Sequence, residues 1–279
     1  MASAIHLPTL FRFPSPSHVL TALPELGPFY VQARNRGGGL GKRMESLDPL
    51  HVPDLDFAFD PDNGLGFAVC DLIGVHAGEI VTGAVTTYAL DFEFAGFPGG
   101  LSLHKFPDMD GLDATLALAR DLPCEVIGKG ELLSWRAGHT ESTEICPCCE
   151  QRAEERARHP ERHALYRILR HAVALQTSLE FRLSADHVDM TSPFTPHRIT
   201  LRNGFVILSD ALSQAAFHVD MRTVHALVID VISLDGVSYS SLHLYDTLGN
   251  LNFHLMAEGT HHAPVWRDLC ENSFEEWEH

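Results

Sequence analysis

The chain has 279 residues, a formal net charge of −17 and 45% hydrophobic residues. This length and apolar content are those of a globular chain with a real core, and they exclude a disordered polypeptide. The acidic excess repels phosphate backbones and anionic lipid, so we expect no nucleic-acid partner. No apolar run approaches the roughly 20 residues that span a bilayer, so we expect no membrane insertion.

The cysteines favour a reducing compartment. There are six, and three of them, Cys146, Cys148 and Cys149, fall within four positions, which is poor spacing for a disulfide framework. The N-terminal stretch also lacks the basic and apolar regions of a secretory signal. We therefore expect a cytoplasmic protein.

The first predicted strand is Pro28–Asn35, where apolar residues alternate with a period of two and Asn begins a turn. A glycine-rich turn follows, with four cations in an otherwise acidic protein: Arg34, Arg36, Lys42 and Arg43. Its exposed N–H groups and charges suit an anionic ligand, and a solvated loop is the alternative. Further on, Phe92–His104 reads as strand, glycine turn and strand, and a short helix follows to Leu122.

The segment from Pro123 to Pro193 has a different character. Glu150–Arg158 is strongly charged and predicts a solvated helix or linker, and an amphipathic helix begins at Pro160. The same segment contains a cluster of residue types that bind zinc or haem iron, namely His139, Cys146, Cys148 and Cys149. Reduced thiols without a metal are the alternative reading.

The remaining elements repeat the first ones. Pro196–Asn203 matches Pro28–Asn35, and Leu242–His254 matches Phe92–His104. Pro28 and Pro196 are 168 residues apart, whereas Gly99 and Gly249 are 150 apart, which predicts an insertion of about 18 residues in the first copy. A final helix opens at Pro264.

These patterns predict an α+β fold of two tandem repeats, each a large antiparallel β-sheet flanked by helices. The expected boundaries are a first repeat over residues 1–122, a linker with helices and the Cys/His cluster over 123–195, and a second repeat over 196–279.

Several short motifs resemble the HemS-type haem-utilisation proteins, also called hemin-degrading factors, which share their unit with the ChuX-like haem carriers. The resemblance covers roughly residues 25–270, and it rests on Gly66–Val69, Ser102–Lys105, Trp135-Arg136, Asp235–Gly249 and Trp266-Arg267. It implies a haem-binding protein of intracellular haem trafficking, and it leaves open whether the protein is an enzyme of oxidative haem degradation.

The resemblance also implies where haem, or a related tetrapyrrole, would bind. His139 is the first candidate for the axial ligand and a cysteine of the cluster is the second. The candidate cations for the propionates are Arg34, Arg36, Lys42, Arg43, Arg198 and Arg202. The alternative is a non-enzymatic scaffold of the same fold, with structural zinc at the cluster. No catalytic residue is proposed, and the oligomeric state stays open between a monomer and a homodimer.

Overall fold

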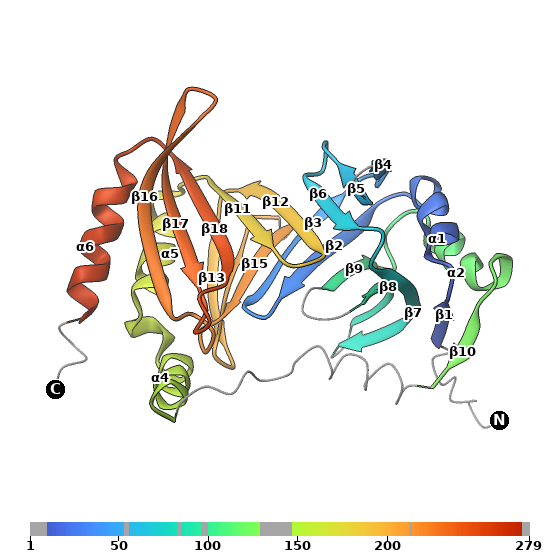
Figure 1. Cartoon of the computed structure of the whole chain (residues 1–279), viewed down its shortest axis with the longest axis horizontal. Helices are drawn as coiled ribbons and strands as arrows, with labels where there is room; N and C mark the ends of the chain where they lie inside the picture. The colour runs from blue at the N-terminus through green and yellow to red at the C-terminus, as the bar shows by residue number, and fades with distance from the viewer. Residues whose placement is uncertain are drawn as a thin grey trace. The chain divides into compact units, whose positions relative to one another are not determined.

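The computed structural model describes residues 10–52, 56–82, 85–95, 100–128, 147–212 and 214–274. As predicted, it is an α+β fold with large antiparallel sheets and few helices (Figure 1). The chain divides into two compact units. Unit 1 contains Met1–Ala33, Arg43–Glu141 and Asp186–Val188, and unit 2 contains Arg34–Lys42, Ser142–Ala185 and Asp189–His279. None of the helices in the described part of the chain has the length and apolar character that a bilayer span requires.

The elements up to residue 128 are β1 (Leu10–Phe13), α1 (Pro16–Ala22), η1 (Leu23–Glu25), β2 (Phe29–Asn35), β3 (Gly38–Met44), β4 (Leu50–Val52), β5 (Phe57–Asp60), β6 (Leu65–Ala68), β7 (Leu72–Thr82), β8 (Val85–Phe94), β9 (Gly100–Lys105), α2 (Leu112–Asp121) and β10 (Glu125–Ile127).

The elements from residue 147 onward are α4 (Pro147–Arg158), η3 (Pro160–Arg162), α5 (Ala164–Leu175), β11 (Leu179–Ser184), β12 (Val188–Phe194), β13 (Arg198–Arg202), β14 (Phe205–Ser209), β15 (Ala215–Asp220), β16 (Ala226–Leu234), β17 (Val237–Tyr245), β18 (Leu251–Glu258) and α6 (His262–Phe274).

In unit 1, six strands lie side by side in the order β10-β1-β7-β8-β9-β2, and a second group runs β6-β5-β4. Alternate residues of the strands point inward, so β6 and β8 meet through an edge-to-face contact of Phe67 and Phe92, with ring centroids 5.8 Å apart. Both side chains are fully buried.

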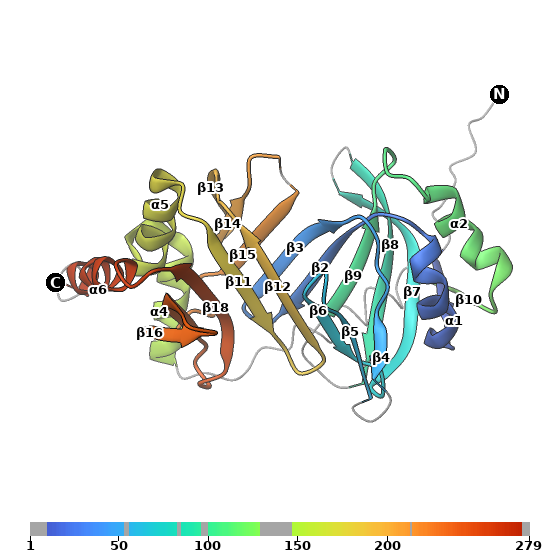
Figure 2. The ribbon, with the colours of Figure 1, turned by 90° about the horizontal axis from the view of Figure 1, so that it is seen from above.

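In unit 2, one group of strands runs β16-β17-β18-β11-β12, and the other runs β15-β14-β13 with residues 38–42 of β3 paired to β15 (Figure 2). The core between them is aromatic. Phe217 of β15 packs against Phe181 of β11 and Phe253 of β18, with ring centroids 4.9 and 4.8 Å apart. Helices α5 and α6 pack on each other and contact β13 and β16 respectively.

The amphipathic pattern after Pro160 correctly predicts helix α5. The imidazole Nδ1 of His163 caps its N-terminus by accepting a hydrogen bond from the Leu165 N–H at 3.2 Å, and Gln176 ends it in a left-handed conformation. Its buried stripe contains Leu165, Ile168 and Leu169. The charged stretch before it is helix α4.

The order of elements confirms the duplication, and it corrects the alignment of its first part. From α1 to α2 the chain runs helix, eight strands and helix, and it runs the same way from α5 to α6. Strand β2 therefore corresponds to β11, since Phe29 and Leu179 are 150 residues apart, and not to β13 as the Pro-x-x-apolar match predicted. Gly38 of β3 and Val188 of β12 are also 150 apart, so the predicted 18-residue insertion does not exist.

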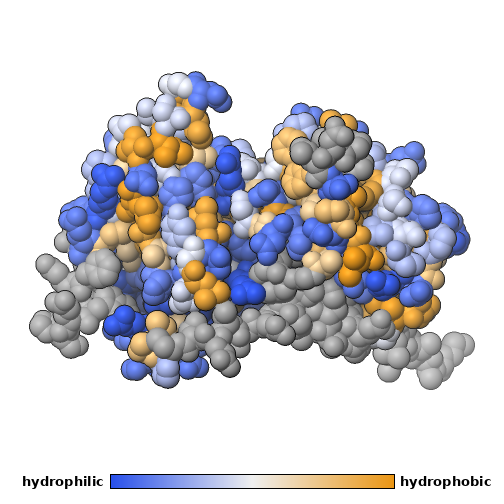
Figure 3. All heavy atoms as spheres, viewed as in Figure 1, coloured by the Kyte–Doolittle hydropathy of each residue, from blue (hydrophilic) through white to orange (hydrophobic). Residues whose placement is uncertain are grey.

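Unit 2 carries apolar side chains on its surface. Val228 and Val231 of β16 and Val237 of β17 are more than a third exposed. Figure 3 shows hydrophobic patches on this part of the surface. Strand β16 ends its group of strands and has one paired neighbour, β17, among the described strands.

Candidate functional site

A tight hairpin in unit 2 sets the geometry of the candidate site. Asn203 and Gly204 connect β13 to β14, and both have positive φ, 52° and 84°. This is the two-residue turn that Asn-Gly favours, because Gly has no Cβ and Asn tolerates the left-handed region. The turn pairs Arg202 with Phe205, and Arg198 then lies opposite Ser209.

This register places two arginines on the side of the hairpin away from the core. Val206 and Leu208 of β14 are fully buried, so Phe205 and Ile207 point to the opposite side. Directly opposed residues of antiparallel strands share a face, so Arg198 and Arg202 lie on the side of Phe205 and Ile207. Both arginines are exposed, and neither makes an ion pair or hydrogen bond with the described residues.

Strand β15 adds a histidine to the same face. His218 lies opposite Ile207, and its ring centroid is 6.0 Å from that of Phe205. Its neighbours in sequence, Phe217 and Val219, are buried in the core. Burial, and secondly the charge of Arg34, lower the pKa of His218 to about 4, so the imidazole is neutral at pH 7.

Strand β3 continues this face next to β15, with glycines in place of larger side chains. Gly39 is paired with His218 and Gly41 with Ala216, so no side chain rises beside the histidine on that strand. Lys42 alternates with these glycines and points to the core side, where its Nζ donates to the Thr191 carbonyl at 3.1 Å.

Arg34 of β2 alternates with the buried Val31 and Ala33, and its charge acts on His218. Asp220 lies opposite Phe205 on the same face, where its carboxylate pairs with Arg222 at 3.1 Å. We call the surface formed by Arg34, Arg198, Arg202, Phe205, Ile207 and His218 the basic face.

Helix α4 is anchored at the end of β15. The Arg156 guanidinium donates from Nε to the Met221 carbonyl at 3.1 Å and from Nη2 to the Arg222 carbonyl at 3.2 Å. Arg222 in turn pairs with Glu154 of the helix, at 3.2 Å. Burial lowers the pKa of Arg156, and these contacts hold α4 next to the strand that carries His218.

The predicted Cys/His cluster is only partly visible. Cys148 and Cys149 lie in the first turn of α4, whereas His139 and Cys146 lie outside the described residues. In the parts of the chain that the structure describes, no three His, Cys, Asp or Glu side chains are grouped to hold a metal ion. The zinc alternative therefore finds no support there.

The remaining predicted cations do not join the basic face. Arg36 lies half-buried in the turn between β2 and β3, and Arg43 pairs with Glu45 at 2.8 Å. Of the six cations that the sequence singles out, Arg198 and Arg202 share the outer side of β13, and Arg34 lies close enough to His218 to lower its pKa.

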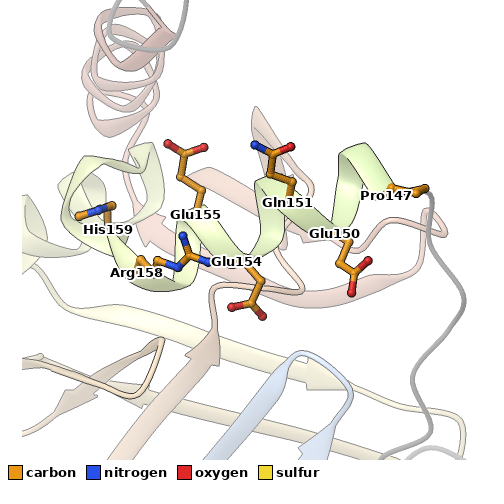
Figure 4. Close-up of a pocket in the computed structure, with 7 residues that line it drawn as sticks. All are labelled: Pro147, Glu150, Gln151, Glu154, Glu155, Arg158 and His159. Atoms are coloured by element: carbon orange, nitrogen blue, oxygen red, sulfur yellow. The ribbon is translucent and has the colours of Figure 1, made fainter.

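A hollow of about 420 Å³ on α4 does not suit an anionic ligand. Glu150, Glu154 and Glu155 line it, with Arg158 and His159 as the basic groups. In Figure 4 the carboxylates of Glu155 and Glu150 project to opposite sides of the helix, so they do not converge on one point. The basic face is therefore the better candidate for an anion.

Sequence reasoning named His218 as one of several strand histidines that could be ligands, but it did not name Phe205 or Ile207. The signal was available, because Arg198, Thr200 and Arg202 alternate on one side of an Asn-Gly turn and Phe205, Ile207 and Ser209 alternate on the other side of that turn. What the sequence does not reveal is that β15 pairs with both β14 and β3, which places His218 among these residues.

Comparison with known proteins supports the fold. No family model matches the sequence, and a search of curated proteins finds no match. The structure is similar to the heme degrading enzyme ChuS of Escherichia coli O157:H7, with 11% identity, a TM-score of 0.65 and coverage of 95% of this chain and 87% of that chain. This chain has the fold of ChuS.

The same fold occurs in two further solved structures. Holo-PhuS, a heme-binding protein from Pseudomonas aeruginosa, matches with 14% identity and a TM-score of 0.64, covering 94% of this chain and 86% of that chain. ChuS described as an E. coli heme oxygenase matches with 12% identity and a TM-score of 0.63, covering 96% and 89%. The resemblance to HemS-type proteins seen in the sequence is thus confirmed at the level of the fold.

Proposed function

We propose that this protein binds haem in haem utilisation, and that the basic face of unit 2 is its binding surface. The observation that carries the proposal is the pair Arg198 and Arg202, two exposed cations with no partner among the described residues, on a protein of net charge −17. The ChuS and PhuS fold supports the same ligand, because those proteins are described as degrading or binding heme.

The residues of the basic face fit the chemistry of haem. A porphyrin needs an apolar surface for its ring and cations for its two propionates, and bound haem supplies an iron with axial coordination positions. Phe205 and Ile207 offer half-buried apolar surface, and arginine guanidinium groups form charge-assisted, bidentate hydrogen bonds with carboxylates. Arg34 adds a third positive charge close enough to His218 to lower its pKa.

The linker residues remain part of the proposal. His139, with Cys146, Cys148 and Cys149 as further candidates, would supply a ligand to the iron. Arg36, Lys42 and Arg43 remain weaker proposals for the propionates, because Lys42 and Arg43 already have the partners described above. Breakdown of haem would also need an electron donor, so binding is the activity that we propose.

The protein is proposed to act in the cytoplasm. Three of the six cysteines fall within four positions, which is poor spacing for a disulfide framework, and Cys70 and Cys124 are free thiols; both observations support a reducing compartment.

A haem titration tests the proposal. Ferric haem is added to the wild-type protein, to the double variant Arg198→Gln/Arg202→Gln and to the control Arg162→Gln/Arg170→Gln, and the Soret band is followed. The control removes the same charge at two exposed positions on η3 and α5 that are not among the residues of the basic face. We expect saturable one-to-one binding by wild type and control, and at least tenfold weaker binding by the first variant.

The proposal fails if wild type leaves the spectrum of free haem unchanged at micromolar concentration. Equal affinities of all three proteins would move the site away from the basic face.

A further inference from the structure

We propose that His218 of β15 is an axial ligand of the haem iron, approaching from the sheet side of the ring. This inference rests on the proposed haem-binding function and assigns a residue of the same site.

The position of His218 in the sheet is the first argument. Across the strands, Thr200, Ile207, His218 and Gly39 form one row on the basic face. Arg198 and Arg202 flank this row on β13, two strands from His218. Adjacent strands are about 4.8 Å apart, which puts β13 about 10 Å from β15.

This spacing suits the shape of haem. The iron lies at the centre of the ring, and both propionates leave from one edge. The histidine that binds the iron and the cations that bind the propionates must therefore lie roughly half a porphyrin width apart. The two arginines are four residues apart along β13, about 13 Å, and their long side chains can converge on two neighbouring carboxylates. His218 and the arginine pair therefore have the offset that one haem requires.

The ring nitrogens of His218 have no hydrogen-bond partner among the described residues, although the side chain is partly buried. Gly39 places no side chain on the β3 side. Phe205 supports one side of the imidazole. Because the ring is neutral at pH 7, one nitrogen keeps a lone pair for a metal.

The duplicated fold provides an internal comparison. The β14–β15 register of Ile207 with His218 recurs 150 residues earlier as Phe57 with Ala68 in unit 1. There Leu50 takes the place of Arg198, and Phe59 the place of Ser209. At these compared positions the first repeat has aromatic and aliphatic groups where the second has a histidine and an arginine, so these positions can ligate iron and pair with propionates in the second repeat and not in the first.

Spectroscopy of a small set of variants tests this assignment. His218→Ala and the similarly sized His218→Gln are compared with wild type and with His197→Ala, an exposed histidine next to β13 whose ring contacts the Thr195 carbonyl. Circular dichroism establishes that each variant is folded. Haem affinity, the Soret maximum and the electron paramagnetic resonance of the ferric complex are then measured.

We expect both His218 variants to bind haem at least tenfold more weakly and with a changed Soret maximum and spin state. Added imidazole should restore the wild-type spectrum in His218→Ala, since it can occupy the vacated ligand position. His197→Ala should match wild type.

The assignment is overturned if His218→Ala and His218→Gln bind haem with the affinity and spectrum of wild type. In that case haem binding itself stands and the ligand lies elsewhere. Failure of the wild type to bind haem would instead remove the proposed function, and the ligand assignment with it.

Discussion

At the scale of single residues, Lys105 in unit 1 shows how a buried charge is accommodated. Its side chain is fully buried, and its ammonium donates to the carbonyls of Leu26 at 2.7 Å, Asp110 at 2.6 Å and Pro28. It also lies 4.2 Å from the centroid of the Phe29 ring. Burial lowers its pKa to about 8, so it remains mostly charged at neutral pH.

Replacing Lys105 with Met should destabilise the protein by about 3 kcal/mol, because three buried carbonyls lose their donor. Urea unfolding measures the change. Arg120→Met is the control, since among the described residues this exposed side chain pairs with its neighbour Asp121, and its loss should change stability by less than about 0.5 kcal/mol. Similar losses for the two variants would contradict a structural role for Lys105.

The sequence predicted Arg34, Arg198 and Arg202 as ligand-binding cations; strand alternation puts Arg198 and Arg202 on one side of β13, and Arg34 is near His218. The sequence also predicted Lys42, which the structure turns toward Thr191. Strand alternation explains the difference. Gly39 and Gly41 lie on the outer side of β3, so Lys42, between them and Arg43 in the sequence, points to the core side. The sequence contains the charges, but the pairing of β3 with β15 decides which of them share a face.

At the scale of elements, the repeat was predicted correctly but its first half was aligned to the wrong strand. The pattern of alternating apolar residues ending in Arg-Asn occurs in both β2 and β13, because it is a general signature of a strand followed by a turn. The hairpin and helix after β8 are longer and more specific, and they aligned β8–β9–α2 with β17–β18–α6 correctly.

Substitution of the glycine that precedes α2 tests how closely the chain packs at this turn. Gly111 has a φ of +77°, and a Cβ there would overlap the carbonyl oxygen of Leu26. Gly249, in the β17–β18 turn, has a φ of +83° but open space around it. We expect Gly249→Ala to cost about 1 kcal/mol from the left-handed backbone alone, and Gly111→Ala to cost clearly more.

Thermal or urea unfolding of both alanine variants provides the comparison. Equal destabilisation of the two would mean that the contact between Gly111 and Leu26 contributes nothing.

At the scale of the whole molecule, three histidines of unit 2 link stability to pH. Burial is the main cause that lowers the pKa values of His163, His218 and His254 to about 4, from an ordinary value of 6.5. Between pH 6.5 and 4 the unfolded chain therefore binds more protons than the folded one. The free energy of unfolding should be level above pH 6.5 and should fall as the pH drops toward 4.

His163 isolates one part of this effect. Its Nδ1 must stay unprotonated to accept the hydrogen bond from Leu165. Asn is also a good N-cap but does not titrate, so His163→Asn should reduce the slope of stability against pH by up to about 1.4 kcal/mol per pH unit. Urea unfolding at a series of pH values measures both slopes. Identical slopes would show that His163 is not a buried neutral group.

The central claim is that haem binds on the basic face of unit 2. Hydrogen–deuterium exchange with and without haem tests it most directly, because unit 1 carries the corresponding face as an internal control. We predict that haem slows exchange in peptides covering residues 198–220 and leaves those covering residues 50–68 unchanged. Protection confined to residues 50–68, or no protection in either segment, would contradict the account.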